Sequence, residues 1–279
     1  AASGPDAGGA GAALKEATVD GTPRGRAALV TGAGSGIGRA IARALAGVGV
    51  RVAVVDLDAA AAEAVAREIR SADGEALALA ADVADAAAVR ATVDRAVEGL
   101  GGVDILVNNA GLQHVAPIVD FPEERWERLL GVMLTGTFLC TKYALPHMIA
   151  RRWGRVVNIA SAHGLVASPY KAAYVAAKHG VVGFTKVAAW EVAEHGITVN
   201  AVCPGYVRTA LVERQIADQA RVHGIPEAEV VERIMLQTAA IKRLLEPDEV
   251  AALVLYLCSD AAAGVTGAAL PIDQGWTAR

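Results

Sequence analysis

Three polar side chains near the middle of the sequence have the types and spacing needed to move a proton. Tyr174 and Lys178 stand four positions apart, so that on a helix they share one face, and Ser161 lies thirteen positions before Tyr174 at the end of a strand-like run. A phenol has a pKa of about 10 and is poorly ionised at neutral pH, but a nearby ammonium favours its charged form. A phenol and an ammonium that share one helix face can therefore take part in proton transfer.

A glycine-rich run over residues 31–38 has the features of a phosphate-binding loop. It follows the first strand-like run and opens a helical stretch, whose free N–H groups and positive dipole suit a pyrophosphate. Asp56 ends the next strand, 18 residues after Gly38, close to the roughly 20 expected of a carboxylate that binds an adenosine ribose. Because this carboxylate would repel a 2′-phosphate, the pattern favours NAD over NADP. The open alternative is that Asp56 merely caps the following helix.

These residues need a parallel sheet to bring them together. From Arg26 onward, apolar strand-like runs alternate with alanine-rich stretches long enough to be crossover helices, such as 37–48 and 59–70. The expected strands cover residues 27–31, 51–56, 76–81, 103–108, 155–160 and 197–203. The pattern predicts an α/β fold: a Rossmann-type, doubly wound parallel sheet with helices on both faces, and ligands at the carboxyl ends of its strands.

The chain is expected to form one NAD-binding catalytic domain over residues 26–279, because no linker or composition break interrupts it. Residues 1–25, rich in Ala, Gly and Pro, are expected to be a flexible leader. The polar stretch 207–246 breaks the strand and helix rhythm, and its apolar positions predict paired helices around residues 224–226. We interpret this stretch as a small helical substrate lid.

The sequence resembles the short-chain dehydrogenase/reductase family over essentially residues 26–279. The strings that carry the resemblance are the glycine-rich run, Asn108-Asn109-Ala110-Gly111, Ser161, Tyr174-Val175-Ala176-Ala177-Lys178 and Cys203-Pro204-Gly205. The resemblance implies an NAD-dependent oxidoreductase in which Tyr174 is the acid and base, Lys178 lowers the pKa of Tyr174 and holds the nicotinamide ribose, and Ser161 orients the substrate oxygen. The residues that it implies for cofactor binding are Gly32, Ser35, Gly36, Ile37, Gly38, Asp56, Asp82, Val83, Asn109, Ala110, Gly111, Tyr174, Lys178, Pro204, Gly205, Val207 and Thr209.

Within the family, residues 108–117, 161–166, 171–180 and 275–276 are similar to those of members that act on a short 3-hydroxy acid or 3-oxo acid. Such a substrate needs hydrogen-bond donors for its carboxylate. The resemblance implies that Gln113, His163, Lys171 and Gln215 supply these donors, with Lys171 providing the charge, and that Tyr206 and Trp276 close the small apolar end.

Three positions depart from the family pattern. Met133 stands where many members carry an asparagine that helps hold a proton-relay water, a task that a methionine side chain cannot perform. Tyr206 replaces a tryptophan after Cys-Pro-Gly, and Gln274 is a further oddity near the C-terminus. Three other functions stay open: a 3-oxoacyl reductase, a polyol or sugar dehydrogenase, and a catalytically silent NAD-binding scaffold. Asp56 argues against the first, which is driven by NADPH.

Composition excludes several classes of partner. A formal charge of −4 argues against a nucleic-acid binder, and the unbroken apolar stretches, such as 251–258, are shorter than the roughly 18 residues of a membrane span. The three cysteines lie far apart, so we expect neither a disulfide framework nor a zinc site. We expect a cytoplasmic protein. The resemblance implies a homotetramer, in which the small residues Gly180, Gly183, Ala188 and Ala189 would let one helix pack closely on a partner.

Overall fold

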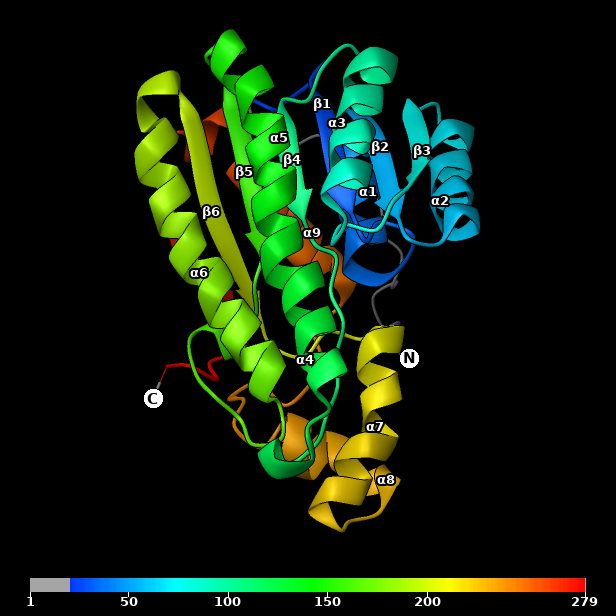
Figure 1. The fold of residues 1–279 in the computed structure, drawn as a ribbon, viewed down its shortest axis with the longest axis vertical. Coiled ribbons are helices and arrows are strands. Elements are labelled where there is room, and N and C mark those ends of the chain that lie inside the picture. Colours follow the sequence, from blue (N-terminus) through cyan, green and yellow to red (C-terminus); the bar gives the residue numbers. More distant parts are fainter. Residues whose placement is uncertain (1–20, 279) are drawn as a thin grey trace, which may run out of the picture.

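The computed structural model describes residues 21–278, which form a sheet of seven parallel strands in the order β3-β2-β1-β4-β5-β6-β7 (Figure 1). The strands are β1 (Ala27–Thr31), β2 (Arg51–Asp56), β3 (Ala76–Ala80), β4 (Ile105–Asn108), β5 (Gly154–Ile159), β6 (Ile197–Pro204) and β7 (Ala269–Ile272). This order, in which the chain turns outward in both directions from β1 and β4, confirms the doubly wound fold. The sequence did not predict β7, a four-residue edge strand that contains Pro271. So short a run with a proline gives almost no strand signal.

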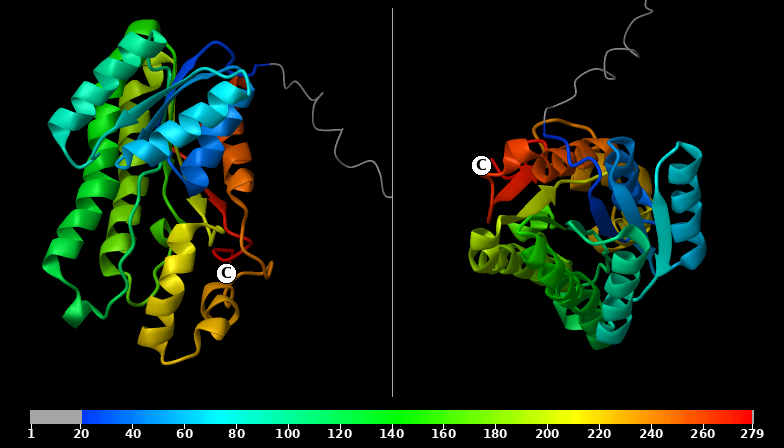
Figure 2. Two further views of the ribbon diagram at one scale, coloured as in Figure 1. Left: turned by 90° about the vertical axis from the view of Figure 1, so that its right-hand side faces the viewer. Right: turned by 90° about the horizontal axis from the view of Figure 1, so that it is seen from above.

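Helices cover both faces of the sheet, as Figure 2 shows from above. The α-helices are α1 (Gly36–Gly47), α2 (Ala59–Ser71), α3 (Ala86–Leu100), α4 (Glu123–Leu130), α5 (Gly136–Arg151), α6 (Ala172–Val192), α7 (Ala210–His223), α8 (Glu227–Val230) and α9 (Pro247–Cys258). Short 3-10 or π segments are η1 (Ile118–Asp120), η2 (Gly131–Thr135), η3 (Ala162–Gly164), η4 (Ala193–His195), η5 (Val231–Met235) and η6 (Asp260–Ala262).

Two hydrophobic cores lie on the two faces of the sheet. In β1, Ala27 and Leu29 join the core under α3, α5 and α6, whereas Ala28 and Val30 join the core under α1, α2 and α9. Neighbouring residues of a strand point to opposite faces, so a strand that is covered on both sides must be apolar throughout. This explains why β1 reads as an unbroken apolar run rather than an alternating one.

The helical stretch Glu123–Arg151, which joins α4, η2 and α5, is long and apolar enough to cross a membrane by length and composition. Half of its apolar window is buried inside the protein, and side chains such as Leu129, Leu139 and Met148 belong to the core on that face of the sheet. The burial of these side chains in the core therefore accounts for the hydrophobicity of the stretch.

Residues 207–246 lie below the carboxyl ends of the strands, where α7 and α8 form a separate helical layer (Figure 1). Helix α7 ends at His223, and Gly224 takes the left-handed conformation that terminates it, with φ +64°. Thr209 caps the other end of α7, where its hydroxyl oxygen accepts the N–H of Val212.

Residues 1–20 of the expected leader lie outside the described residues. Its last part, residues 21–25, packs on the domain: the Gly21 carbonyl accepts the N–H of Asp260, and the Gly25 N–H donates to the Gly49 carbonyl.

Candidate active site

The glycine-rich loop is held against the end of β4 by hydrogen bonds. The Asn109 side-chain amide donates to the carbonyls of Thr31 and Gly32, each at 3.0 Å, and the Thr31 hydroxyl oxygen accepts the N–H groups of Asn109 and Ala110. A Cβ atom at Gly38 would lie 2.2 Å from the Gly32 carbonyl oxygen, so only glycine lets α1 start this close to the loop. The loop is thereby fixed before any ligand arrives.

Asp56 turns its carboxylate toward this loop. One oxygen accepts the N–H of Gly34 at 2.8 Å, and the other accepts the N–H of Asp58 at 3.1 Å. The cap of α2 is Asp58, which accepts the N–H groups of Ala60 and Ala61. The capping role that was the alternative for Asp56 is therefore taken by Asp58.

Asp82 forms an ion pair that the sequence did not reveal. Its carboxylate lies 2.7 Å from the guanidinium of Arg128, which comes from α4. Burial alone would raise the pKa of Asp82, but hydrogen bonds from Arg128 and from the Ala84 N–H bring it below its usual value. Arg128 lies 46 residues further along the chain, and no local pattern marks it as a partner.

The three candidate catalytic residues meet where β5 ends beside α6. Ser161 caps η3, and a Cβ atom at Gly164 would lie 2.9 Å from the Lys178 carbonyl oxygen, so this glycine permits the close approach of η3 and α6. The Lys178 ammonium donates to the Ile159 carbonyl at 2.7 Å and lies 5.7 Å from the Tyr174 ring centroid.

The electrostatics of these groups are dominated by burial. Burial lowers the pKa of Lys178 to about 8. Burial also raises the pKa of Tyr174 above its ordinary value, and the nearby Ser161 side chain acts in the opposite direction. In the free protein the phenol is therefore the favoured form of Tyr174 at neutral pH.

His163 lies at the centre of an aromatic cluster. Its ring makes edge contacts with Tyr174, Tyr206 and Trp276, the last at a centroid distance of 4.8 Å. Nδ1 lies 3.5 Å from Ser161 Oγ, and Nε2 lies 3.0 Å from Ser168 Oγ. Both ring nitrogens thus lie near hydroxyl groups of the chain, and the expected role of His163 toward a substrate carboxylate stays a prediction.

Lys171 is a buried cation with one side-chain hydrogen bond among residues 21–278. Only 2% of the residue is exposed, and its ammonium donates to the Tyr206 hydroxyl oxygen at 2.8 Å. Burial lowers the pKa of Lys171 to about 7 and raises that of Tyr206. The Tyr206 ring is stacked on Trp276, with centroids 5.7 Å apart and planes within 5°. The tyrosine at this position therefore keeps a flat aromatic wall and adds a hydroxyl that meets the ammonium.

Gln113 and Gln215, which were both expected to bind the substrate, differ in the hydrogen bonds that their side chains make. The Gln113 side-chain oxygen accepts the His114 N–H, so its NH2 group is left to donate. The Gln215 NH2 group donates to the Leu211 carbonyl, and its oxygen is buried with no partner among the described residues. Rotation of this amide by half a turn would exchange the two groups and present the NH2 group instead.

One cavity of about 310 Å³ connects all of these features. It runs from Asp56 past the glycine-rich loop to Ser161 and Lys171, and α7 contributes its far wall. Every residue that the sequence suggested for catalysis, cofactor or substrate lines it except Gly38, which acts behind the loop. Lining residues that the sequence did not suggest include Val55, Leu57, Leu112, Arg128, Val132, Ile159, Leu211 and Arg214. Within residues 21–278, no three His, Cys, Asp or Glu side chains gather as they would around a metal, and the three cysteines are buried and free.

Met133 does not turn a polar group toward this cavity. It is 1% exposed, and its sulfur would lie 3.9 Å from a Cβ atom placed at Gly111. Its carbonyl oxygen accepts the Thr137 hydroxyl at 2.7 Å.

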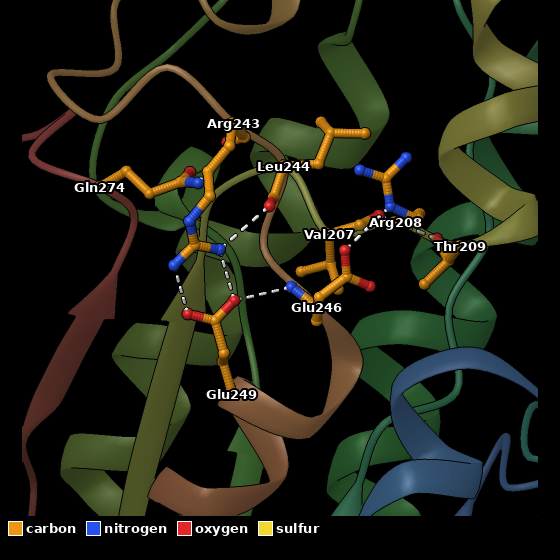
Figure 3. A network of polar contacts seen from close by, with 8 residues as sticks. All are labelled: Val207, Arg208, Thr209, Arg243, Leu244, Glu246, Glu249 and Gln274. Atoms are coloured by element: carbon orange, nitrogen blue, oxygen red, sulfur yellow. Dashed lines mark hydrogen bonds and ion pairs between the residues drawn. The ribbon is translucent and has the colours of Figure 1, made fainter. Parts of the chain in front are cut away.

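The connection from residues 207–246 to α9 is held by the polar network in Figure 3. Arg243 forms a two-point ion pair with Glu249 at 2.6 and 2.7 Å, and Glu249 also accepts the Glu246 N–H at the start of α9. Gln274 donates to the Arg243 carbonyl and adopts a left-handed backbone, with φ +58°. Gln274 thus ties the C-terminal segment to the end of the stretch 207–246.

The comparisons agree with this geometry. A family model for short chain dehydrogenases matches residues 26–220. The chain is 48% identical to a D-beta-hydroxybutyrate dehydrogenase of Rhizobium meliloti over 179 residues, which is 64% of this chain and 69% of the relative. A protein of the same name from Cupriavidus necator is 48% identical over 199 residues, 71% and 77% of the two chains. The cis-4-hydroxycyclohexanecarboxylate dehydrogenase of Sinomonas cyclohexanicum is 43% identical over 218 residues, 78% and 83%. The chain therefore belongs to the short-chain dehydrogenase/reductase family of oxidoreductases.

Proposed function

We propose that this protein is an NAD-dependent dehydrogenase that interconverts D-3-hydroxybutyrate and acetoacetate. The observation that carries the proposal is the buried Lys171 ammonium in the same cavity as Ser161 and Tyr174. A buried cation is costly unless it meets a negative or polar partner, and a small hydroxy acid supplies the negative charge. The two relatives named for this activity support the same substrate.

The choice of NAD rests on the residues at the far end of the cavity. The Asp56 carboxylate suits the two hydroxyls of an adenosine ribose and would repel a 2′-phosphate. Its neighbours in the chain, Val55 and Leu57, are apolar. The Arg128 guanidinium, which also lines the cavity, is engaged by Asp82. Val55, Leu57 and the paired Arg128 therefore offer a 2′-phosphate no free positive charge.

Bound NAD would accept the hydride that leaves the substrate carbon. Tyr174 takes the hydroxyl proton during oxidation and returns a proton to the carbonyl oxygen during reduction. Ser161 hydrogen-bonds the substrate oxygen as its charge changes. The Lys178 ammonium is charged below its pKa of about 8 and favours the ionised phenol, which offsets part of the effect of burial on Tyr174.

The substrate carboxylate is held by Lys171 together with amide N–H groups from Gln113 and Gln215. The stacked rings of Tyr206 and Trp276 close the apolar end and leave room for a small substrate. Residues 207–246 would act as a lid that excludes water, with α7 bringing Gln215 to the cavity.

Relative kcat/KM values test this proposal against its competitors. We expect D-3-hydroxybutyrate with NAD to exceed L-3-hydroxybutyrate, cis-4-hydroxycyclohexanecarboxylate and 2-butanol, which lacks the carboxylate, each by about tenfold or more. A higher kcat/KM for cis-4-hydroxycyclohexanecarboxylate would indicate that the substrate is a larger hydroxy acid. A higher kcat/KM for 2-butanol would show that Lys171 does not bind a substrate carboxylate, and it would favour a polyol or sugar dehydrogenase.

We also propose that the chain self-associates through one face of α6. Gly183, Val187 and Trp190 follow one another at helical spacing, and Trp190 is 87% exposed. A Cβ atom at Gly183 would meet no atom within 4 Å. The other small residues suggested for this contact face inward: Ala188 and Ala189 are buried, and Gly180 lies against Leu134.

A further inference from the structure

Four lysine and arginine side chains line the cavity, and three of them are engaged by other groups of the chain. These pairs are Lys171 with the Tyr206 hydroxyl, Lys178 with the Ile159 carbonyl, and Arg128 with the Asp82 carboxylate. The fourth is Arg214 of α7, whose guanidinium makes no ion pair and no side-chain hydrogen bond among residues 21–278. Its positive charge is therefore the one in this cavity that is left for a ligand.

The acid that could hold Arg214 within α7 is turned elsewhere. Asp218 stands four positions later, a spacing at which helical side chains commonly pair, but its carboxylate lies 2.9 Å from the Arg221 guanidinium. The Cα–Cβ bonds of a helix tilt toward its N-terminus. The Arg214 side chain therefore leaves α7 toward the first turn of the helix, away from Asp218.

The first turn of α7 lies against the first turn of α1. A Cβ atom placed at Gly36, the first residue of α1, would lie 3.2 Å from Cγ2 of Thr209, the cap of α7. Ala210 stands four positions before Arg214, so the two share one helix face, and both line the cavity. Arg214 thus leans toward the end of the cavity where the glycine-rich loop opens α1.

This end of the cavity suits a diphosphate. The free N–H groups at the start of α1 offer hydrogen bonds, but the helix dipole supplies only about half a positive charge. The diphosphate of NAD carries two negative charges, and the carboxylates of Asp56 and Asp82 line the same cavity. A guanidinium can donate two parallel hydrogen bonds to a phosphate. Arg214 would therefore supply the full positive charge that the loop lacks.

Arg214 and its neighbour Gln215 face different parts of the cavity. Successive residues of an α-helix are rotated by about 100° around its axis. Gln215 is only 7% exposed, whereas Arg214 is exposed, and both line the cavity. If Gln215 meets the substrate carboxylate, Arg214 is directed at another part of the bound molecules.

We propose that Arg214 binds the diphosphate of NAD from α7, an inference that rests on the cofactor named in the proposed function. The glycine-rich loop holds the diphosphate from the side of the sheet, and the guanidinium holds it from the helical layer. Because Arg214 and Gln215 are adjacent in α7, a bound cofactor also fixes the helix that carries Gln215.

Calorimetry with three ligands tests this contact without turnover. NAD and ADP-ribose both contain the diphosphate, whereas adenosine contains neither phosphate. We expect Arg214→Gln to raise the Kd of NAD and of ADP-ribose by about tenfold and to leave the Kd of adenosine, measured by competition with NAD, unchanged. Arg214→Lys keeps the charge without the two parallel hydrogen bonds, so it should recover part of the affinity. Arg221→Gln changes an exposed arginine of the same helix outside the cavity and should bind all three ligands like the wild type.

Equal Kd values for ADP-ribose in the wild type and in Arg214→Gln would overturn the inference. An equal loss of affinity for adenosine would also overturn it, because the defect would then lie in the packing of α7 and not at the diphosphate. The proposed substrate is judged separately, by turnover of the wild type. A wild-type protein that binds ADP-ribose more tightly than Arg214→Gln does, but oxidises no D-3-hydroxybutyrate, would refute the proposed substrate and support the role of Arg214.

Discussion

The Lys171 ammonium donates a 2.8 Å hydrogen bond to the Tyr206 hydroxyl oxygen inside the cavity. This contact gives a buried cation a partner in the free protein and leaves its other N–H groups for a carboxylate. It also places the charge beside the aromatic wall that Tyr206 forms with Trp276. A positive charge and a flat aromatic wall thus lie side by side in the cavity.

The first prediction concerns pH. Because the pKa of Lys171 lies at about 7, its positive charge is present below this pH and is lost above it. The KM for D-3-hydroxybutyrate should therefore rise about tenfold between pH 6 and pH 8. In Tyr206→Phe the charged form loses its hydrogen-bond acceptor, so the rise should begin at a lower pH. Steady-state kinetics over this range measure both effects.

Two lysine variants complete that test. Lys171→Gln should have a high KM that no longer depends on pH in this range. Lys186→Gln alters an exposed lysine of α6, the helix that Lys171 precedes, and should retain the wild-type profile. An unchanged pH profile in Lys171→Gln would show that another group binds the carboxylate.

The second prediction concerns cofactor choice. Asp56→Asn removes the charge but keeps an oxygen that can accept the Gly34 N–H, so it should lower the preference for NAD over NADP by about tenfold or more. Asp58→Ala should instead lower the free energy of unfolding by about 1 kcal/mol through loss of the α2 cap and leave the preference unchanged. Kinetics with both cofactors and chemical denaturation separate the two. If the wild type and Asp56→Asn preferred NAD over NADP to the same degree, the assignment of Asp56 to the adenosine ribose would be contradicted.

The third prediction concerns self-association. Trp190→Glu combined with Val187→Glu places two charges on the exposed face of α6 and should reduce the mass measured by light scattering to that of one chain. Trp126→Glu, on α4, changes another partly exposed tryptophan and should leave the assembly intact. A wild-type protein with the mass of a single chain would refute the proposed contact.

The sequence predicts elements with strong local signals and misses those that depend on distant partners. Six strands were expected within one or two residues, because their apolar runs are long and bounded by turns. The position of Asp56 was expected from its spacing to the glycine-rich run. In contrast, the Asp82 and Arg128 pair joins two elements whose approach depends on the packing of α4, and nothing in the local sequence encodes it. The contacts of both His163 nitrogens likewise appear only when η3, α6 and the loop at Ser168 are placed together.

The most direct test of the account is NADH formation at saturating D-3-hydroxybutyrate and NAD by the wild type and by Tyr174→Phe, with NAD binding measured on both by calorimetry. The account predicts steady turnover by the wild type, a loss of about 100-fold or more in kcat for Tyr174→Phe, and similar NAD affinity in the two proteins. NAD binding by a wild-type protein that forms no NADH from D-3-hydroxybutyrate would contradict the account.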